Sequence, residues 1–127
     1  MSTINATTVQ ATNVQDTAGA NSSTTAQLTS GRAKAWCEFN GSGTPATRAS
    51  FNVSSITDVL GGEYDVNFTT DFSSNRYSAI GTVTNSSRAN LSISDLAVDK
   101  FHVNTRETDT GTFTDYGSVS VVAFGDQ

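Results

Sequence analysis

An all-β fold is what the sequence predicts: an antiparallel β-sandwich of about seven strands over residues 31–127, preceded by an extended N-terminal arm over residues 1–30. Composition points to it first, because Ser and Thr make up roughly three residues in ten and Gly numbers 10. Threonine and the β-branched residues favour strands, whereas Gly, Asn, Asp and Ser favour the turns between them. Short segments also alternate apolar and polar residues, which is typical of half-buried antiparallel strands. Turn signals recur about every ten residues, a spacing that suits a sandwich or a small barrel.

Residues 1–30 are rich in Ser, Thr, Asn, Gln and Ala, and Asp16 is their only ionisable side chain. Fixing a residue costs roughly 1–2 kcal/mol of backbone entropy, and this stretch has little apolar surface to offset that cost. We therefore expect contacts with other chains to order the arm and anchor the protein in an assembly; a flexible linker is the alternative. Fully extended, such an arm reaches on the order of 100 Å. Its candidate anchoring side chains are the sizeable apolar ones, Ile4, Val9, Val14 and Leu28.

The first predicted strand follows Gly31 and alternates from residue 33 to residue 40. Alternation assigns one set of side chains to the core and the other set to the outer face of the sheet. A lone cysteine in the core set behaves as a small hydrophobe. The core set is Ala33, Ala35, Cys37 and Phe39, and the outer set is Lys34, Trp36, Glu38 and Asn40.

The later strands follow from the same alternation. The cleanest covers residues 63–69, where Tyr64 and Val66 point to one side. Residues 49–53 also alternate, and a phase shift of one residue before Ile56 indicates a β-bulge. The last strand is apolar on both faces, which predicts a central strand or one at an interface. Further strands are expected at 77–83, 91–94, 96–103 and 118–124, with turns at 40–45, 60–62, 71–75, 85–87 and 108–111.

Trp36 is the candidate contact residue of the sandwich. An outward-facing tryptophan anchors another chain or stacks on a sugar ring. The alternative is that a bulge near Gly31 inverts the register and places Trp36 in the core. A subunit contact, a core position and a ligand-stacking platform are therefore all open at this point.

Residues suited to catalysis or metal binding are few. The only histidine, His102, follows Phe101 in an alternating strand, which predicts an exposed position on the polar face rather than a catalytic one. With one His and one Cys, the chain lacks the ligand set of a transition-metal site. Calcium requires only oxygen ligands, and Glu107, Asp109 and Asp115 are the nearest candidates, although solvated turn acids explain them more simply. We therefore expect no enzyme activity and no cofactor.

The net charge of -5 argues against a basic surface for nucleic acid. No apolar run approaches the roughly 20 residues of a membrane span. The first residues lack the basic region and hydrophobic core of a secretory signal, and a lone cysteine forms no intrachain disulfide. We expect synthesis in a reducing cytoplasm, without nucleic-acid binding or membrane insertion.

Several segments in the first two thirds of the chain together carry a resemblance to known proteins. They are Asn21–Thr24, Gly31–Trp36, Phe39–Thr44, Arg48–Asp58 and Gly62–Thr70, with the leader Val14–Gly19 before them. Together they resemble a module common in structural proteins of marine tailed bacteriophages, usually described as tail-fibre-like. The resemblance covers roughly residues 13–83 and fades from Asn85 onward. The chain departs from the pattern at Cys37, where valine is usual, and at Val59–Leu60, where a polar turn is usual.

The resemblance implies a non-enzymatic virion structural protein, made in the cytoplasm of the bacterial host. It implies a homo-oligomer, in particular a homotrimer, in contact with other virion proteins of the tail or capsid. A short tail spike or fibre tip that attaches to a host-surface glycan fits it, and so does a capsid decoration protein whose arm ties down capsid subunits. A carbohydrate-binding module with Trp36 or Tyr77 stacking on sugar is the alternative of another class.

Overall fold

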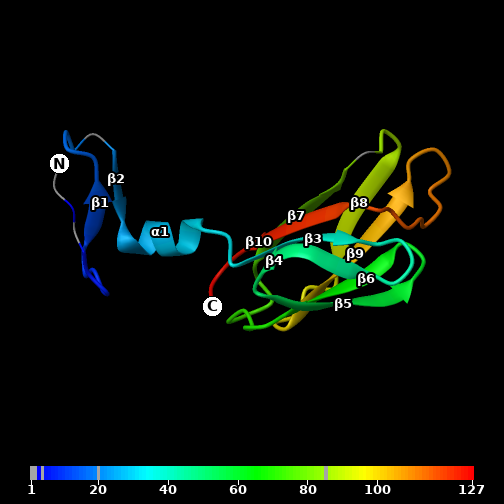
Figure 1. The fold of residues 1–127 in the computed structure, drawn as a ribbon, viewed down its shortest axis with the longest axis horizontal. Helices are drawn as coiled ribbons and strands as arrows, with labels where there is room; N and C mark the ends of the chain where they lie inside the picture. The colour runs from blue at the N-terminus through cyan, green and yellow to red at the C-terminus, as the bar shows by residue number, and fades with distance from the viewer. Residues whose placement is uncertain (1–2, 4, 20, 85) are drawn as a thin grey trace. The chain divides into compact units, whose positions relative to one another are not determined.

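Two four-stranded antiparallel sheets pack against each other in residues 33–127, which confirms the predicted β-sandwich (Figure 1). The computed structural model describes residues 3, 5–19, 21–84 and 86–127. Residues 1–32 form a separate unit, which we call the N-terminal unit. Each sheet turns one face to the shared core and the other to solvent, so the sandwich has two outer faces.

The first sheet has the strand order β4-β3-β10-β7. As predicted, β10 is central, because it pairs with β3 on one side and with β7 on the other. The alternation of β3 is also confirmed, with Cys37 and Phe39 buried. Burial raises the pKa of the Cys37 thiol to about 12, and the charge of Glu38 adds to the shift, so this cysteine is an unreactive core residue. The strands are β3 (Ala35–Asn40), β4 (Ala46–Phe51), β7 (Ser78–Val83) and β10 (Val119–Phe124).

The second sheet has the strand order β5-β6-β9-β8. Its strand β6 shows the predicted strict alternation, with Tyr64 and Val66 fully buried between half-buried polar neighbours. Strand β9 pairs with both β6 and β8. The strands are β5 (Val53–Leu60), β6 (Glu63–Phe68), β8 (Ala89–Ser94) and β9 (Lys100–Glu107).

The core lies between the sheets and is built around aromatic rings. The ring of Phe68 has its centroid 4.8 Å from that of Phe72, 5.7 Å from that of Phe101 and 5.9 Å from that of Tyr77. Such tilted and edge-on pairs stabilise a core beyond the area that they bury. The buried apolar residues are Ala35, Cys37, Phe39, Tyr64, Val66, Phe68, Phe72, Tyr77, Phe101, Val103, Val119, Val121 and Ala123.

Residues 49–53 alternate as a single strand would, but they contain the end of one strand and the start of another, and these two strands belong to different sheets. Strand β4 ends at Phe51 and β5 begins at Val53. Between them Asn52 has φ 55°, in the left-handed region that Asn tolerates, and its side-chain oxygen accepts a hydrogen bond from the Thr70 backbone at 2.7 Å. The chain thereby crosses from one sheet to the other. The predicted bulge is confirmed as a register shift between Val53 and Ser55.

The strand predicted at residues 96–103 starts later and ends later than expected. Asp95 has φ 47°, and the backbone N–H of Ala97 donates to the carbonyl of Lys100 at 2.9 Å. These residues therefore form a turn before β9, and Leu96 packs on the core from that turn rather than from a strand.

A hydrogen-bonded joint ties three connecting segments together at one end of the sandwich. The buried hydroxyl of Tyr64 donates to the carbonyl of Gly41 at 3.0 Å and contacts Oδ1 of Asp115 at 2.7 Å. The same carboxylate oxygen accepts the backbone N–H of Gly62 at 2.6 Å. Burial, followed by the bond to Asp115, raises the pKa of Tyr64, so the phenol stays protonated as a donor.

The N-terminal unit is not extended throughout, which corrects the expectation of an extended arm. Strands β1 (Asn13–Gln15) and β2 (Ser22–Thr24) pair antiparallel, and α1 (Thr25–Gly31) follows directly. Thr24 and Gln27 form a capping box at the start of α1. No residue of α1 is buried, so the unit has local hydrogen bonds but no apolar core to which the helix contributes.

Candidate functional site

Trp36 lies on the outer face of the first sheet, as predicted, and 41% of it is exposed. The core alternative is therefore wrong for this residue. The sequence also places Lys34 on that outer face, but Lys34 is only 6% exposed. It precedes β3, and its backbone N–H donates to the carbonyl of Ala123 at 2.9 Å, which holds it against β10.

Trp36 belongs to a continuous apolar row across all four strands of the first sheet. Its register partners are Phe51 on β4 and Val122 on β10, and Val122 in turn pairs with Ile80 on β7. Directly paired residues share one face of a sheet, so the four side chains point outward together. Phe51 is 54% exposed and Ile80 is 65% exposed. We call Phe51, Trp36, Val122 and Ile80 the apolar row.

A hollow of about 280 Å³ adjoins the aliphatic end of the apolar row. It lies between β7 and β10, where Ile80 pairs with Val122 and the short side chains of Thr82 and Ser120 pair next to them. Phe124, two residues beyond Val122 on the same face of β10, is 37% exposed. Within the row, one end therefore presents rings and the other presents smaller side chains beside a depression, and the ring of Phe124 lies further along β10.

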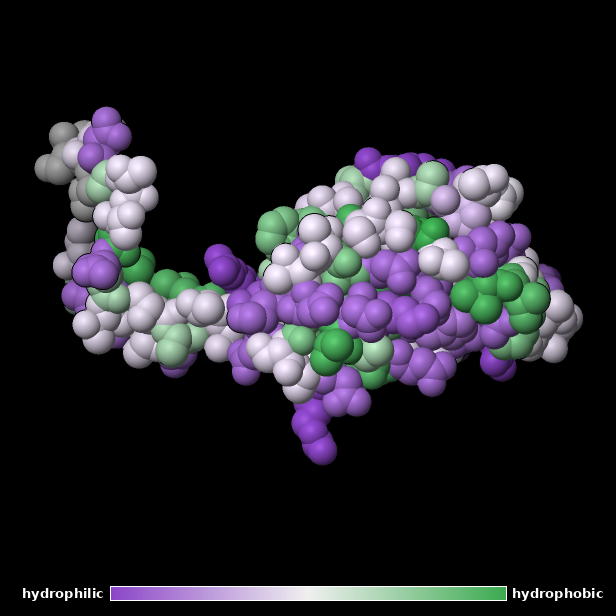
Figure 2. All heavy atoms as spheres, turned by 90° about the horizontal axis from the view of Figure 1, so that it is seen from below, coloured by the Kyte–Doolittle hydropathy of each residue, from purple (hydrophilic) through white to green (hydrophobic). Residues whose placement is uncertain are grey.

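The surface outside the first sheet shows smaller apolar areas. Figure 2 shows one face of the domain on which hydrophilic residues predominate, with hydrophobic side chains gathered at the end where β5 turns into β6. Val59 and Leu60, at that end of β5, are 45% and 65% exposed.

The predicted anchoring residues of the N-terminal unit are exposed where the structure describes them. Val9 is 68% exposed, Val14 55% and Leu28 45%. Ile4 lies outside the described residues. Val9 borders a shallow, mainly polar depression that Thr12 and Thr25 also line. The structure therefore leaves these apolar side chains available for contact, and their anchoring role stays a prediction.

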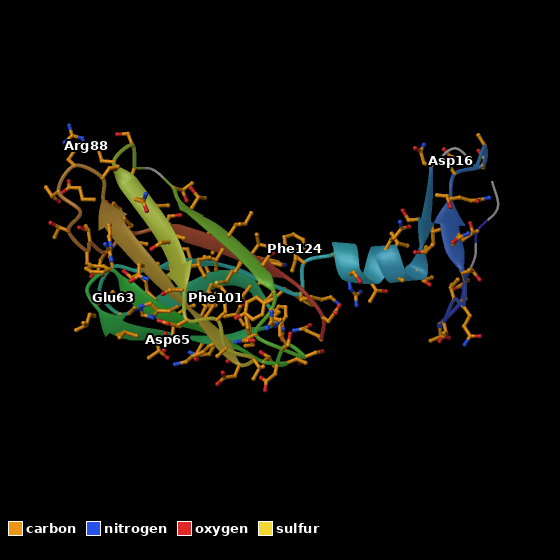
Figure 3. The ribbon with its side chains drawn as sticks, turned by 180° about the vertical axis from the view of Figure 1, so that it is seen from behind. Asp16, Glu63, Asp65, Arg88, Phe101 and Phe124 are labelled. Carbon is orange, nitrogen blue, oxygen red and sulfur yellow. The ribbon has the colours of Figure 1, made fainter. Side chains whose placement is uncertain are left out.

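The outer face of the second sheet carries a polar cluster that the sequence analysis missed. Asp65 lies opposite His102 in the register of β6 and β9, and its side chain points away from the space between the sheets that holds Phe101 (Figure 3). Oδ1 of Asp65 lies 2.8 Å from Nδ1 of His102, and Oδ2 lies 2.7 Å from Nζ of Lys100. Nε2 of His102 lies 3.8 Å from Glu63. We call these four residues the acid–base cluster.

His102 is on the polar face, as predicted, but its side chain is only 15% exposed, because the two acids enclose it. Burial on its own would raise the pKa of the Asp65 carboxyl; the hydrogen bonds and charges of Lys100 and His102 outweigh burial and hold that pKa below its usual range. The cross-strand pairs thus join β6 to β9, and each carboxylate oxygen of Asp65 has a basic partner. The cluster is explained as a stabilising network.

The depressed pKa of Asp65 predicts a loss of stability in acid. A carboxyl whose pKa is lower in the folded than in the unfolded chain stabilises the fold above its unfolded pKa of about 3.9. That stabilisation is lost as the pH falls through the folded pKa. We expect Asp65→Asn to lower the free energy of unfolding at pH 7 by about 1–2 kcal/mol and to flatten its dependence on pH below about 4. Urea unfolding at a series of pH values measures both, with the exposed Asp71→Asn as control; identical acid profiles for Asp65→Asn and wild type would contradict the assignment.

The loop acids considered for calcium bind to separate partners. Asp109 pairs with Arg88 at 2.9 Å, Glu107 accepts a hydrogen bond from Thr110 at 3.1 Å, and Asp115 belongs to the joint with Tyr64. Among residues 3, 5–19, 21–84 and 86–127, no three His, Cys, Asp or Glu side chains gather closely enough to hold a metal ion. The described part of the chain also contains no helix long and apolar enough to cross a bilayer.

Comparison with known proteins adds no further constraint on this site. No protein-family model, no curated protein and no solved structure matches the chain.

Proposed function

We propose that this chain is a non-enzymatic bacteriophage virion structural protein, a homo-oligomeric surface appendage of the tail-fibre or spike type, mounted through residues 1–30. The observation that carries the proposal is the distribution of exposed apolar surface. The N-terminal unit exposes Val9, Val14 and Leu28, and the sandwich exposes the apolar row. Apolar side chains that gather on a surface mark contacts with other molecules.

The phage-module resemblance supports the same proposal from the sequence. It begins within the N-terminal unit and continues through β3, β4, β5 and β6. A short spike, a fibre tip and a capsid decoration protein all use a display domain with an anchoring segment. Three copies are the number that the resemblance implies for a tail fibre.

Loss of the arm tests the mounting role. We expect a chain without residues 2–30 to fold, because the sandwich core lies entirely in residues 33–127, but to be absent from particles. Circular dichroism reports folding, and mass spectrometry of purified particles reports incorporation. A full-length variant with Val9, Val14 and Leu28 changed to Ser should show the same loss, whereas Thr8, Thr12 and Thr29 changed to Ser should not. Normal copy number without the arm would refute the mounting role.

A carbohydrate-binding module is the second candidate, and one observation favours it. Trp36 and Phe51 are exposed register partners on neighbouring strands, so two aromatic side chains on which a sugar can stack lie next to each other on the outer face. Tyr77 does not take part, because it is 8% exposed and its hydroxyl donates to the carbonyls of Ala97 and Lys100. A glycan array tests the sugar platform: binding that disappears in Trp36→Ala supports it and excludes a capsid decoration protein, which binds no glycan. Particle incorporation in the arm experiment then separates a glycan-binding spike from a free carbohydrate-binding module.

A further inference from the structure

We propose that the aromatic half of the apolar row, Phe51 and Trp36, packs on the aliphatic half, Val122 and Ile80, of a second copy of this chain. The inference deepens the proposed function, on which it rests for the premise that the chain assembles with itself. It assigns the self-association to one face of the sandwich, the outer face of the first sheet.

The apolar row is long enough to form the centre of such a contact. Adjacent strands lie about 4.8 Å apart, so four paired residues span roughly 14 Å across the sheet. The register pairs place all four residues in one line, from Phe51 through Trp36 and Val122 to Ile80. Two such sheets can pack face to face with their strands nearly aligned, as the sheets of a sandwich do.

The two halves of the row differ in shape in a way that makes the face complementary to itself. Rings project at the β4–β3 end, and the β10–β7 end has the hollow of about 280 Å³ beside Ile80 and Val122. An apolar cavity of about 150 Å³ already accommodates a benzene ring, so this hollow has room for an aromatic side chain of a neighbour. Rings against rings would leave both hollows empty, whereas rings against the aliphatic half fill them.

The same contact is compatible with two symmetries of a small homo-oligomer, a two-fold pair and a closed ring of three. In a two-fold pair each copy offers its rings to the hollow of the other, and the contact forms twice. In a closed ring of three, each copy offers its rings to the next copy. The proposal is therefore about which surfaces meet, and it is compatible with the trimer that the resemblance implies.

Charge also favours a second copy over this face rather than over the opposite one. The strands of the first sheet contain one acid and one base, Glu38 and Arg48, and these form an ion pair at 2.6 Å. Two copies with a net charge of -5 each can therefore approach through this sheet without bringing unpaired acids together. The strands of the second sheet contain four acids against two bases and His102, so two copies that met through that sheet would bring an excess of negative charge together.

The exposed area matches the central part of a stable interface. Of the row, Phe51, Trp36 and Ile80 are 54%, 41% and 65% exposed, which corresponds to roughly 320 Å² at about 200 Å² a side chain. A standard interface buries about 800 Å² on each partner and has an apolar centre with a polar rim. The row supplies that centre, and the polar residues around it, such as Ser120 and Thr82, supply the rim.

Introducing opposite charges into the two halves of the row, in the purified full-length protein, tests the contact. Trp36→Lys changes the aromatic half and Ile80→Glu changes the aliphatic half; both residues are exposed, so the fold should tolerate either change. We expect each variant alone to raise the dissociation constant of self-association at least about thirty-fold by sedimentation. Mixing the two should restore association: in a two-fold pair one contact is then intact and the other brings Lys against Glu, and in a mixed ring of three only one contact of the three stays disrupted. Matched controls outside the row are Val98→Lys, 41% exposed like Trp36, and Leu60→Glu, 65% exposed like Ile80.

Three results would overturn the proposal. They are a wild-type protein that is monomeric up to about 1 mM, controls that weaken association as much as the row variants, and a mixture that associates no better than each variant alone. Circular dichroism confirms that each variant is folded before its association is interpreted. Because this measurement needs no particle and the arm experiment needs particles, failure of the contact and failure of the virion assignment are distinguishable.

Discussion

We expect Gly62→Ala to lower the free energy of unfolding by about 3 kcal/mol or more. Gly62 closes the turn between β5 and β6 with φ +74°, a conformation that costs a residue with a side chain more than it costs glycine. A Cβ there would lie 2.5 Å from the backbone nitrogen of Thr114 and 2.6 Å from the carbonyl oxygen of Thr105. Both atoms belong to the backbone, so neither can rotate away, and the joint that includes Asp115 must open.

The neighbouring glycine provides the control for this prediction. Gly61 lies in the same turn, and a Cβ there would meet no atom within 4 Å. Gly61→Ala should therefore change the free energy of unfolding by less than about 1 kcal/mol. Urea unfolding followed by the fluorescence of Trp36 measures both variants. Equal losses in the two would show that the turn, rather than the close approach of Gly62 to the next loop, sets the stability.

The second large effect is expected for Phe39→Ala. Phe39 is fully buried in β3, and its ring lies edge-on to that of Tyr64 with the centroids 5.3 Å apart. Truncation removes this contact across the two sheets and leaves a cavity, which together cost about 3–5 kcal/mol. Thermal unfolding should show a correspondingly lower midpoint.

Phe113→Ala is the matched control, because Phe113 is 37% exposed and has the guanidinium of Arg106 4.0 Å from its ring centroid. Loss of an exposed cation–π contact costs about 1 kcal/mol at most. If Phe39→Ala were no more destabilising than Phe113→Ala, the centre of the core would lie elsewhere.

Local alternation was sufficient to predict much of the sandwich. It identified β6 and the outward position of Trp36, and it indicated that β10 is central, because these features depend on neighbouring residues along one strand. It did not separate β4 from β5, since the crossing depends on the left-handed conformation of Asn52, which alternation does not encode. In the N-terminal unit, two local sequence signals could have predicted the hairpin and the helix. They are Gly19, which adopts φ 71° in the turn, and the three-residue spacing of Thr24 and Gln27, which form a capping box.

The apolar row could not be found from one strand at a time. Phe51, Trp36, Val122 and Ile80 come from four strands, and only the register of three strand pairs aligns them. The same holds for the acid–base cluster, in which Asp65 and His102 are far apart in the sequence and meet through the pairing of β6 with β9. Both surfaces are assembled across strands, and a single sequence does not specify that pairing.

The joint at Asp115 has a practical consequence for work on this protein. The backbone and side chain of Thr105 are hydrogen-bonded to Thr114, and the next residue, Asp115, accepts a hydrogen bond from Gly62. The loop between β9 and β10 is therefore held at its base. Residues 108–111 beyond it are exposed, and Gly111 has open space around it. That tip is therefore the natural place for an epitope tag or a fluorophore, because a label there is remote from the strands that carry the row and leaves their pairing unchanged.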